Sequence, residues 1–141
     1  MSYRESASFL SQPRNGQKSR VLTVGHSEDT RLLLHSIFGR LGWTFHAVDT
    51  CRHAMQLLQK GPVPVVISAE YLPDGDWKSL LRSLATLSPR PELIVFCDRL
   101  DDELWAEVLN LGGYDVILSP LDAEEVAIVS SLAAQSPELS H

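Results

Sequence analysis

The sequence predicts an α/β fold, namely a doubly wound (βα)5 domain whose five parallel strands have the flavodoxin-like order 2-1-3-4-5. From residue 20 onward, short and almost entirely apolar segments alternate five times with amphipathic segments. Apolar strands of this kind are typical of a parallel sheet that helices cover on both faces. The connections are only a few residues long, and right-handed crossovers without a long insertion favour this strand order.

Five segments have the composition of strands, and they cover residues 20–25, 43–48, 63–69, 92–97 and 114–118. The first is a β-branched run that ends at Gly25, the second alternates between apolar and polar residues, and the fourth is apolar nearly throughout. These patterns indicate buried or half-buried strands. Pro64 is expected at the start of the third strand, where a missing N–H is tolerated.

Five segments have helical periodicity, and they cover residues 27–42, 49–61, 75–87, 100–113 and 119–135. In the first, Ser27 is a candidate N-cap and Gly42 a stop. The last opens with Pro120 and a carboxylate-rich first turn, both of which favour a helix start. Trp43 and Trp77 open a strand and a helix, and we expect them to be half-buried packing residues.

The bulk composition favours one ordinary domain. The chain has 141 residues, of which 44% are hydrophobic, and this is enough for one core. No apolar run approaches the ~18 residues that span a membrane, and the N-terminus lacks the apolar region of a secretion signal. The two cysteines, Cys51 and Cys97, have no metal-type spacing. Free thiols in a cytoplasmic protein are the simplest interpretation.

The charge is distributed unevenly along the chain, whose net charge is −6. The first twenty residues contain one acidic residue, Glu5, and four basic ones: Arg4, Arg14, Lys18 and Arg20. The remainder is therefore more acidic than the whole, which argues against nucleic acid as a partner of the domain. We predict a disordered basic tail over 1–19, a domain over 20–136 and a short tail over 137–141.

The carboxyl ends of the strands form the functional edge of such a sheet. Small and polar residues occupy the predicted strand ends: Gly25, His26, Ala69, Glu70, Cys97, Asp98 and Ser119. Any chemistry or binding by the sheet is therefore expected at these positions.

Four segments together make residues 20–135 resemble the receiver (CheY-like) domain of bacterial two-component response regulators. They are "VLTVGHSEDTRLLL", "VVISAEYLPDGDW", "LIVFCD" and "GGYDVILSP". They look like the family's first strand and helix, its third strand with the following loop, its fourth strand and its fifth strand. The resemblance implies the doubly wound fold and a role in signal transduction.

The same resemblance implies a degenerate pseudo-receiver, because the positions that the family uses for phosphorylation carry other residues. The acidic pair falls on Gly25 and His26, the phosphoacceptor on Ala69, the hydroxyl residue on Cys97, the lysine on Ser119 and the reporter aromatic on Val116. Ala69 offers no nucleophile, Gly25 offers no ligand, and His26 is a poor ligand for Mg²⁺, which prefers hard oxygen atoms. We therefore expect no catalytic residue, no metal and no cofactor.

Glu70 and the pair of His26 and Cys97 leave alternatives open. Side chains alternate along a strand, so Glu70, one residue beyond the acceptor position, is expected as an exposed loop carboxylate rather than as a phosphoaspartate mimic. His26 and Cys97 could form a nucleophile pair or help to hold zinc. A small buried cysteine and a loop histidine are the simpler expectation.

The leading expectation is a phosphorylation-independent protein-interaction module, an atypical response regulator that is not an enzyme. Its partner would be a kinase, regulator or effector, or a second copy in a homodimer. The resemblance implies an interaction face that includes Trp105, Glu107, Tyr114 and Val116, although Trp105 could also be a core residue. The alternative is a small-ligand or metal sensor that uses the emptied pocket, and an enzyme that uses Cys97 is the third possibility. The chain could be a stand-alone adaptor or a piece of a longer protein.

Overall fold

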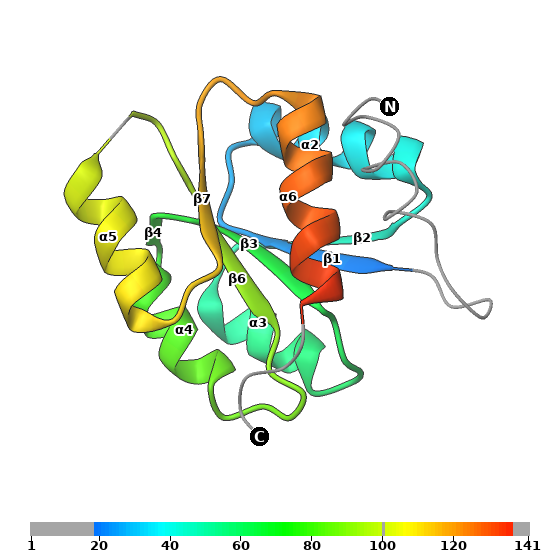
Figure 1. Cartoon of the computed structure of the whole chain (residues 1–141). Helices are drawn as coiled ribbons and strands as arrows, with labels where there is room; N and C mark the ends of the chain where they lie inside the picture. Colours follow the sequence, from blue (N-terminus) through cyan, green and yellow to red (C-terminus); the bar gives the residue numbers. More distant parts are fainter. Residues whose placement is uncertain (1–18, 100, 137–141) are drawn as a thin grey trace.

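The computed structural model describes residues 19–99 and 101–136, and its main sheet has five parallel strands in the order β2-β1-β3-β6-β7 (Figure 1). The strands are β1 (Arg20–Val24), β2 (Thr44–Val48), β3 (Val65–Ala69), β6 (Glu92–Cys97) and β7 (Asp115–Leu118). This order corresponds to 2-1-3-4-5 within the sheet, so the predicted fold class is confirmed. Apart from residue 19, the predicted tails over 1–19 and 137–141 lie outside the described residues.

Helices cover both faces of the sheet (Figure 1). They are α2 (Glu28–Leu41), α3 (Cys51–Leu58), α4 (Trp77–Leu84), α5 (Asp102–Leu111) and α6 (Ala123–Gln135). Helices α2 and α6 lie on one face, and α3, α4 and α5 lie on the other. None of the helices in the described ranges is long and apolar enough to cross a membrane.

The two faces of the sheet make two hydrophobic cores because successive strand side chains point in opposite directions. In β3, Val65 and Ile67 pack with α2 and α6, whereas Val66 between them packs with α3, α4 and α5. All three side chains are at most 1% exposed. This two-sided burial explains why the strands read as almost unbroken apolar runs.

The predicted start and end of the first helix are confirmed. The Ser27 side chain accepts a hydrogen bond from the Thr30 N–H, and Gly42 ends the helix in the left-handed region at φ 76°. The predicted start of the last helix, however, was placed too early. The helix begins at Ala123 because Asp122 is its N-cap and accepts from the N–H groups of residues 124 and 125. An aspartate cap of this kind marks a helix start more strongly than Pro120 does.

A short antiparallel hairpin between β3 and α4 was not predicted. It consists of β4 (Tyr71–Leu72) and β5 (Gly75–Asp76), so the helix that was expected from residue 75 begins at Trp77. The Asp74 carboxylate in its turn accepts hydrogen bonds of 2.9 and 3.0 Å from the N–H groups of Cys51 and Arg52 at the start of α3. The hairpin is thereby attached to a helix more than twenty residues earlier in the chain.

Trp43 and Trp77 are buried, at 6% and 2% exposure, rather than half-buried as expected. Trp43 packs on Phe38 in the α2–α6 core, with a distance of 5.1 Å between the ring centroids. Trp77 belongs to the opposite core. Trp43 lies between α2 and β2, and Trp77 is the first residue of α4, directly after the β5 strand of the hairpin.

Candidate functional site

A cavity of about 760 Å³ opens at the carboxyl edge of the sheet, where β1, β3 and β6 end. Its walls come from these strand ends and from the starts of α2 and α5: Gly25, His26, Ser27, Thr30, Ala69, Glu70, Tyr71, Phe96, Cys97, Asp98, Arg99, Asp101 and Leu104. Four of the five predicted pocket positions line it. The fifth, Ser119, is exposed and does not line it, although its N–H donates to the Cys97 carbonyl at 2.9 Å.

Leu72 of the hairpin packs against Gly25 at the edge of this site. A Cβ added to Gly25 would overlap the Leu72 Cδ2 and would lie 3.5 Å from the Ala69 Cβ. Leu72 itself is only 7% exposed, so its side chain would have to move within the core. Gly25 also has a φ of +80°, which L-residues with side chains rarely adopt. The position therefore has neither the space nor the backbone conformation for a carboxylate.

His26 is held in one tautomer on the cavity wall. Its Nε2 lies 2.9 Å from the Ile67 carbonyl oxygen, and because a carbonyl only accepts, Nε2 carries the hydrogen. Its Nδ1 is a buried acceptor without a hydrogen-bond partner among the described residues. Burial lowers the pKa of His26 despite the opposing effect of the Ile67 hydrogen bond. The ring is therefore neutral at pH 7 and contacts Phe96 edge-on.

Cys97 has the properties of a core thiol rather than of a nucleophile. It is 4% exposed, and its Sγ lies 3.6 Å from the Arg99 carbonyl oxygen. Burial, and then the negative charge of Glu70, raise the pKa of Cys97. Within the described ranges no hydrogen bond joins Cys97 to His26. A protonated, buried thiol without a base is poorly suited to nucleophilic catalysis.

Glu70 lies on the cavity wall, not in an exposed loop as expected. It is half-buried and lines the cavity beside Ala69. The expectation assumed that strand alternation continues through residue 70, but β3 ends at Ala69 and the hairpin begins immediately afterwards. The Glu70 carbonyl accepts from the Trp77 N–H at 3.0 Å, which fixes this turn.

The cavity does not have the ligand arrangement of a metal site. Across residues 19–99 and 101–136, no group of three or more histidine, cysteine, aspartate and glutamate side chains could hold a metal ion. The carboxylates of Glu70, Asp98 and Asp101 all line the cavity, but they do not converge on one point in that way. The metal form of the sensor alternative thus has no support in the geometry.

The residues of the predicted interaction face lie on different sides of the sheet. Trp105 on α5 is 49% exposed, which answers the open question of whether it is a core residue. Glu107 forms an ion pair with Lys78 at 2.9 Å. Tyr114 packs against the α2–α6 core, whereas Val116 packs against the core under α3, α4 and α5. Of these four side chains, Trp105 offers the most apolar surface to a partner.

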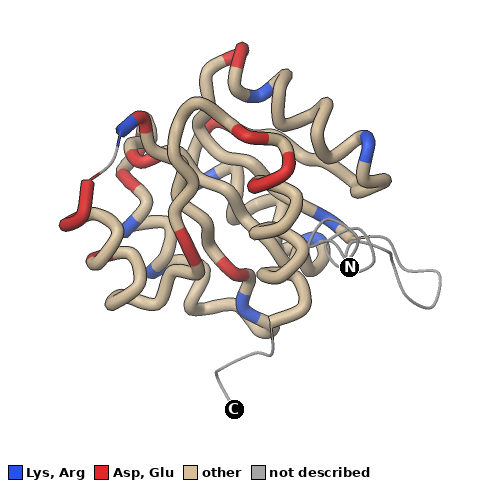
Figure 2. Tube along the Cα trace, turned by 45° about the horizontal axis from the view of Figure 1, so that its top comes forward, with Lys and Arg blue, Asp and Glu red and all other residues tan. Residues whose placement is uncertain are grey.

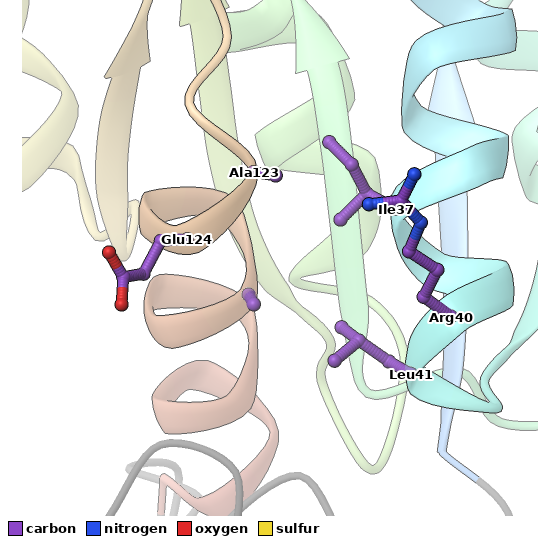
Figure 3. A pocket seen from close by; sticks show the side chains of 6 residues that line it. Ile37, Arg40, Leu41, Ala123 and Glu124 are labelled. Carbon is purple, nitrogen blue, oxygen red and sulfur yellow. The ribbon is translucent and has the colours of Figure 1, made fainter. Parts of the chain in front are cut away.

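Two features of the surface were missed by the sequence reasoning. Leu109, 38% exposed and one helical turn after Trp105, extends the apolar strip on α5, and the four-residue spacing could have indicated it. The second feature is a groove of about 270 Å³ between α2 and α6, and Figure 3 shows Ile37, Arg40, Leu41, Ala123 and Glu124 along it. No sequence pattern predicts this groove, because it arises where two helices distant in sequence meet.

The sequence of the chain is similar to that of a known regulatory protein. No protein family model matches the chain. The chain is similar to regulatory protein AtoC of Escherichia coli (strain K12), with 24% identity over 117 residues and 83% of this chain covered. Because those residues are 25% of AtoC, the chain spans about a quarter of the length of this curated relative.

Several solved structures share the fold. The signal receiver domain of an HD domain-containing protein from Pseudomonas fluorescens Pf-5 is 28% identical and has a TM-score of 0.75, with 84% of this chain and 96% of that chain covered. The beryllofluoride-activated NtrC4 receiver domain dimer is 22% identical, with a TM-score of 0.76 and coverages of 82% and 96%. NtrX from Brucella abortus in complex with ATP is 19% identical, with a TM-score of 0.77 and coverages of 84% and 27%. The structural neighbours are thus response regulator receiver domains, and this chain has their fold.

Proposed function

We propose that this domain is a phosphorylation-independent protein-interaction module in bacterial two-component-type signal transduction. It acts as an atypical, degenerate receiver domain and catalyses no reaction. The receiver domains among its structural neighbours support the signalling role. Its two free cysteines, Cys51 and Cys97, fit a reducing compartment such as the cytoplasm.

The observation that carries the proposal is the contact between Leu72 and Gly25 beside Ala69. Phosphoryl transfer to a side chain needs a nucleophilic oxygen and a cation that neutralises the developing charge. Ala69 has no such oxygen, and Leu72 fills the space that a carboxylate at position 25 would need. Replacing Ala69 alone would not supply the missing cation ligands.

The partner is a signalling protein, that is a kinase, a regulator or an effector, or a second copy of the chain. The apolar strip of Trp105 and Leu109 on α5 supports such a contact, because exposed tryptophan and leucine side chains can be buried in an interface. One of the structural neighbours is a receiver domain dimer, which is compatible with the homodimer. Leu111 at the end of α5 is a further exposed apolar side chain, at 52%, and Glu107 on the same helix is paired with Lys78.

Treatment with a small phosphoryl donor and Mg²⁺ tests the proposal. The protein and its Ala69→Asp variant are incubated with acetyl phosphate and measured by intact-mass spectrometry. Neither should gain a phosphoryl group, because the variant regains the nucleophile but not the metal ligands. A stable, hydroxylamine-sensitive phosphoryl adduct on the unaltered protein would reject phosphorylation independence. A known receiver domain with all its acidic residues serves as the positive control.

A further inference from the structure

The groove between α2 and α6 has a mostly apolar lining. Ile37 and Leu41 lie one turn apart on α2, and Figure 3 shows both side chains pointing toward α6. Ala123 and Ala127 line the α6 side, and their methyl groups are too small to fill the space between the helices. At about 270 Å³, the groove is smaller than the clefts of about 300–1,000 Å³ that hold drug-sized ligands. It suits one or two apolar side chains of a peptide segment instead.

The chain enters the domain next to this groove. The Ser19 carbonyl accepts a hydrogen bond of 2.9 Å from the Thr44 N–H, and Thr44 lies shortly after Leu41, the last residue of α2. Residues 1–18 are therefore attached beside the end of the groove that Arg40 and Leu41 line. A site so close to the attachment point meets a tethered segment at a high effective concentration, on the order of millimolar for a short flexible tether.

The segment over residues 1–18 has the composition of a ligand for such a groove. Phe9 and Leu10 are two large apolar residues in succession, and a serine stands on either side of the pair. A short polar segment cannot form a core of its own, so these side chains are buried only where another surface accepts them. From Leu10 to Ser19 the chain can span up to about 30 Å. This exceeds the single turn of α2, about 5 Å long, that lines the groove.

The charges of the segment and of the α6 side of the groove are complementary. Residues 1–18 contain one acidic residue and three basic ones: Arg4, Arg14 and Lys18. Figure 2 shows acidic residues at the start of α6, where the sequence has Asp122, Glu124 and Glu125. These opposite charges attract the segment toward α6. Arg40 on α2 repels basic groups, so the basic residues of the segment are expected on the α6 side of the groove.

We propose that the N-terminal segment over residues 1–18 docks in the groove between α2 and α6 and places the Phe9–Leu10 pair against its apolar lining. Removal of these side chains and of the lining from water drives the contact. Another apolar ligand then reaches the groove only by displacing the segment. The contact does not depend on the proposed function, because the groove and the carboxyl-edge cavity share no lining residue.

Photo-cross-linking of the full chain tests this contact. Phe9 is replaced by p-benzoylphenylalanine, a photoreactive aromatic residue, and the products are mapped by mass spectrometry. The cross-links are expected on residues 37–41 or 123–127 of the same chain. Mixing unlabelled and nitrogen-15-labelled protein before irradiation distinguishes a cross-link within one chain from a cross-link between two chains.

Two alanine substitutions make the test specific to the groove. Ala127→Trp fills the groove and should reduce the yield of these cross-links about fivefold or more. Ala106→Trp, on the exposed surface of α5, is the matched control and should leave the yield unchanged. Circular dichroism and urea unfolding check that both variants fold. Leu10→Ser, which alters the segment and not the helices, should also reduce the yield.

A uniform spread of cross-links over the surface, cross-links near Trp105 on α5, or no cross-link at all would overturn the proposal. Cross-links that join two chains would also overturn it, because they would assign the groove to a second copy. An unchanged yield in both Ala127→Trp and Leu10→Ser would show that the groove is not the docking site. None of these results bears on phosphorylation, which the acetyl phosphate experiment decides by itself.

Discussion

The Leu72 side chain occupies the space that a Cβ on Gly25 would need. These two residues are distant in sequence, and they meet because the β4–β5 hairpin folds back over the end of β1. The contact makes Gly25 a requirement of the local packing as well as of the backbone, whose φ is +80° there. A side chain at position 25 would therefore require both the Leu72 side chain and the local backbone to shift.

Gly25→Ala should destabilise the protein more than Gly42→Ala does. Both glycines have a positive φ, but a Cβ at Gly42 would meet nothing within 4 Å. Gly42→Ala should cost about 1–2 kcal/mol through the backbone alone, and Gly25→Ala should cost a further 1–3 kcal/mol or so through overpacking. Urea unfolding at pH 7 measures both free energies. Equal costs would contradict the close contact with Leu72, and adding Leu72→Ala should remove part of the extra cost.

Asp74→Ala should lower the urea midpoint near pH 7, and this effect should become smaller as the pH falls below the ordinary aspartate pKa. Hydrogen bonds from the N–H groups of Cys51 and Arg52 lower the pKa of Asp74. A lowered folded-state pKa means that the stabilisation is present above the ordinary aspartate pKa and is lost as the pH falls through the folded value. Asp98→Ala, which removes an exposed aspartate, is the control. A midpoint difference that persists at low pH would contradict this role.

His26 should make the folded state less stable as the pH falls below about 6.5. Because burial lowers the pKa of His26 in the folded state, the unfolded chain takes up a proton first, and stability decreases with falling pH until the folded-state pKa is reached. His26→Gln should flatten the dependence of the unfolding free energy on pH between 7 and 5. His53→Gln, on the exposed surface of α3, is the matched control. The same change in slope for both variants would argue against burial of His26 as the cause of this pH dependence.

The three tryptophans should differ sharply in their response to acrylamide. Trp105 is 49% exposed, whereas Trp43 and Trp77 are 6% and 2% exposed. The fluorescence of Trp43 and Trp77 should thus resist quenching, and Trp105→Phe should remove the quenchable part. Trp105→Ala should cost less than about 1 kcal/mol of unfolding free energy, while Trp43→Ala should cost about 3–5 kcal/mol. A large loss for Trp105→Ala would place its ring in the core.

Cys97 should react with iodoacetamide at pH 7 no faster than an ordinary exposed thiol. It is buried, and burial together with Glu70 raises its pKa, so both access and thiolate content are reduced. Cys51, which is partly exposed, should react first. Peptide mapping by mass spectrometry follows the two sites separately. Rapid alkylation of Cys97 would revive the interpretation of this residue as a nucleophile.

The fold could be predicted from the sequence because its strands are buried on both faces and its helices have recognisable ends. Ser27 and Gly42 marked the first helix correctly. The β4–β5 hairpin could not be predicted, since each of its strands has two residues and carries no periodicity. Its absence from the prediction also explains the error at Glu70, because strand alternation stops where the hairpin begins.

Some of the positions that line the cavity were predictable, but their arrangement was not. Gly25, His26, Ala69 and Cys97 were expected at strand ends and line the cavity, since parallel strands end at one edge. The contact of Leu72 with Gly25 depends on how the hairpin folds back, and no local sequence pattern encodes that direction. Tyr114 and Val116 were grouped on one interaction face by the resemblance to receiver domains, yet they pack against opposite cores.

The turn of the β4–β5 hairpin also determines where the chain can tolerate changes in length. Asp74 accepts hydrogen bonds from the start of α3, and two residues later Asp76 caps α4 through a capping box with Ser79. A single added residue between Asp74 and Asp76 would move one carboxylate away from its helix, so either α3 or α4 would lose the hydrogen bonds at its N-terminus. Natural or engineered insertions should therefore avoid residues 73–76 and accumulate in connections that hold no such pair.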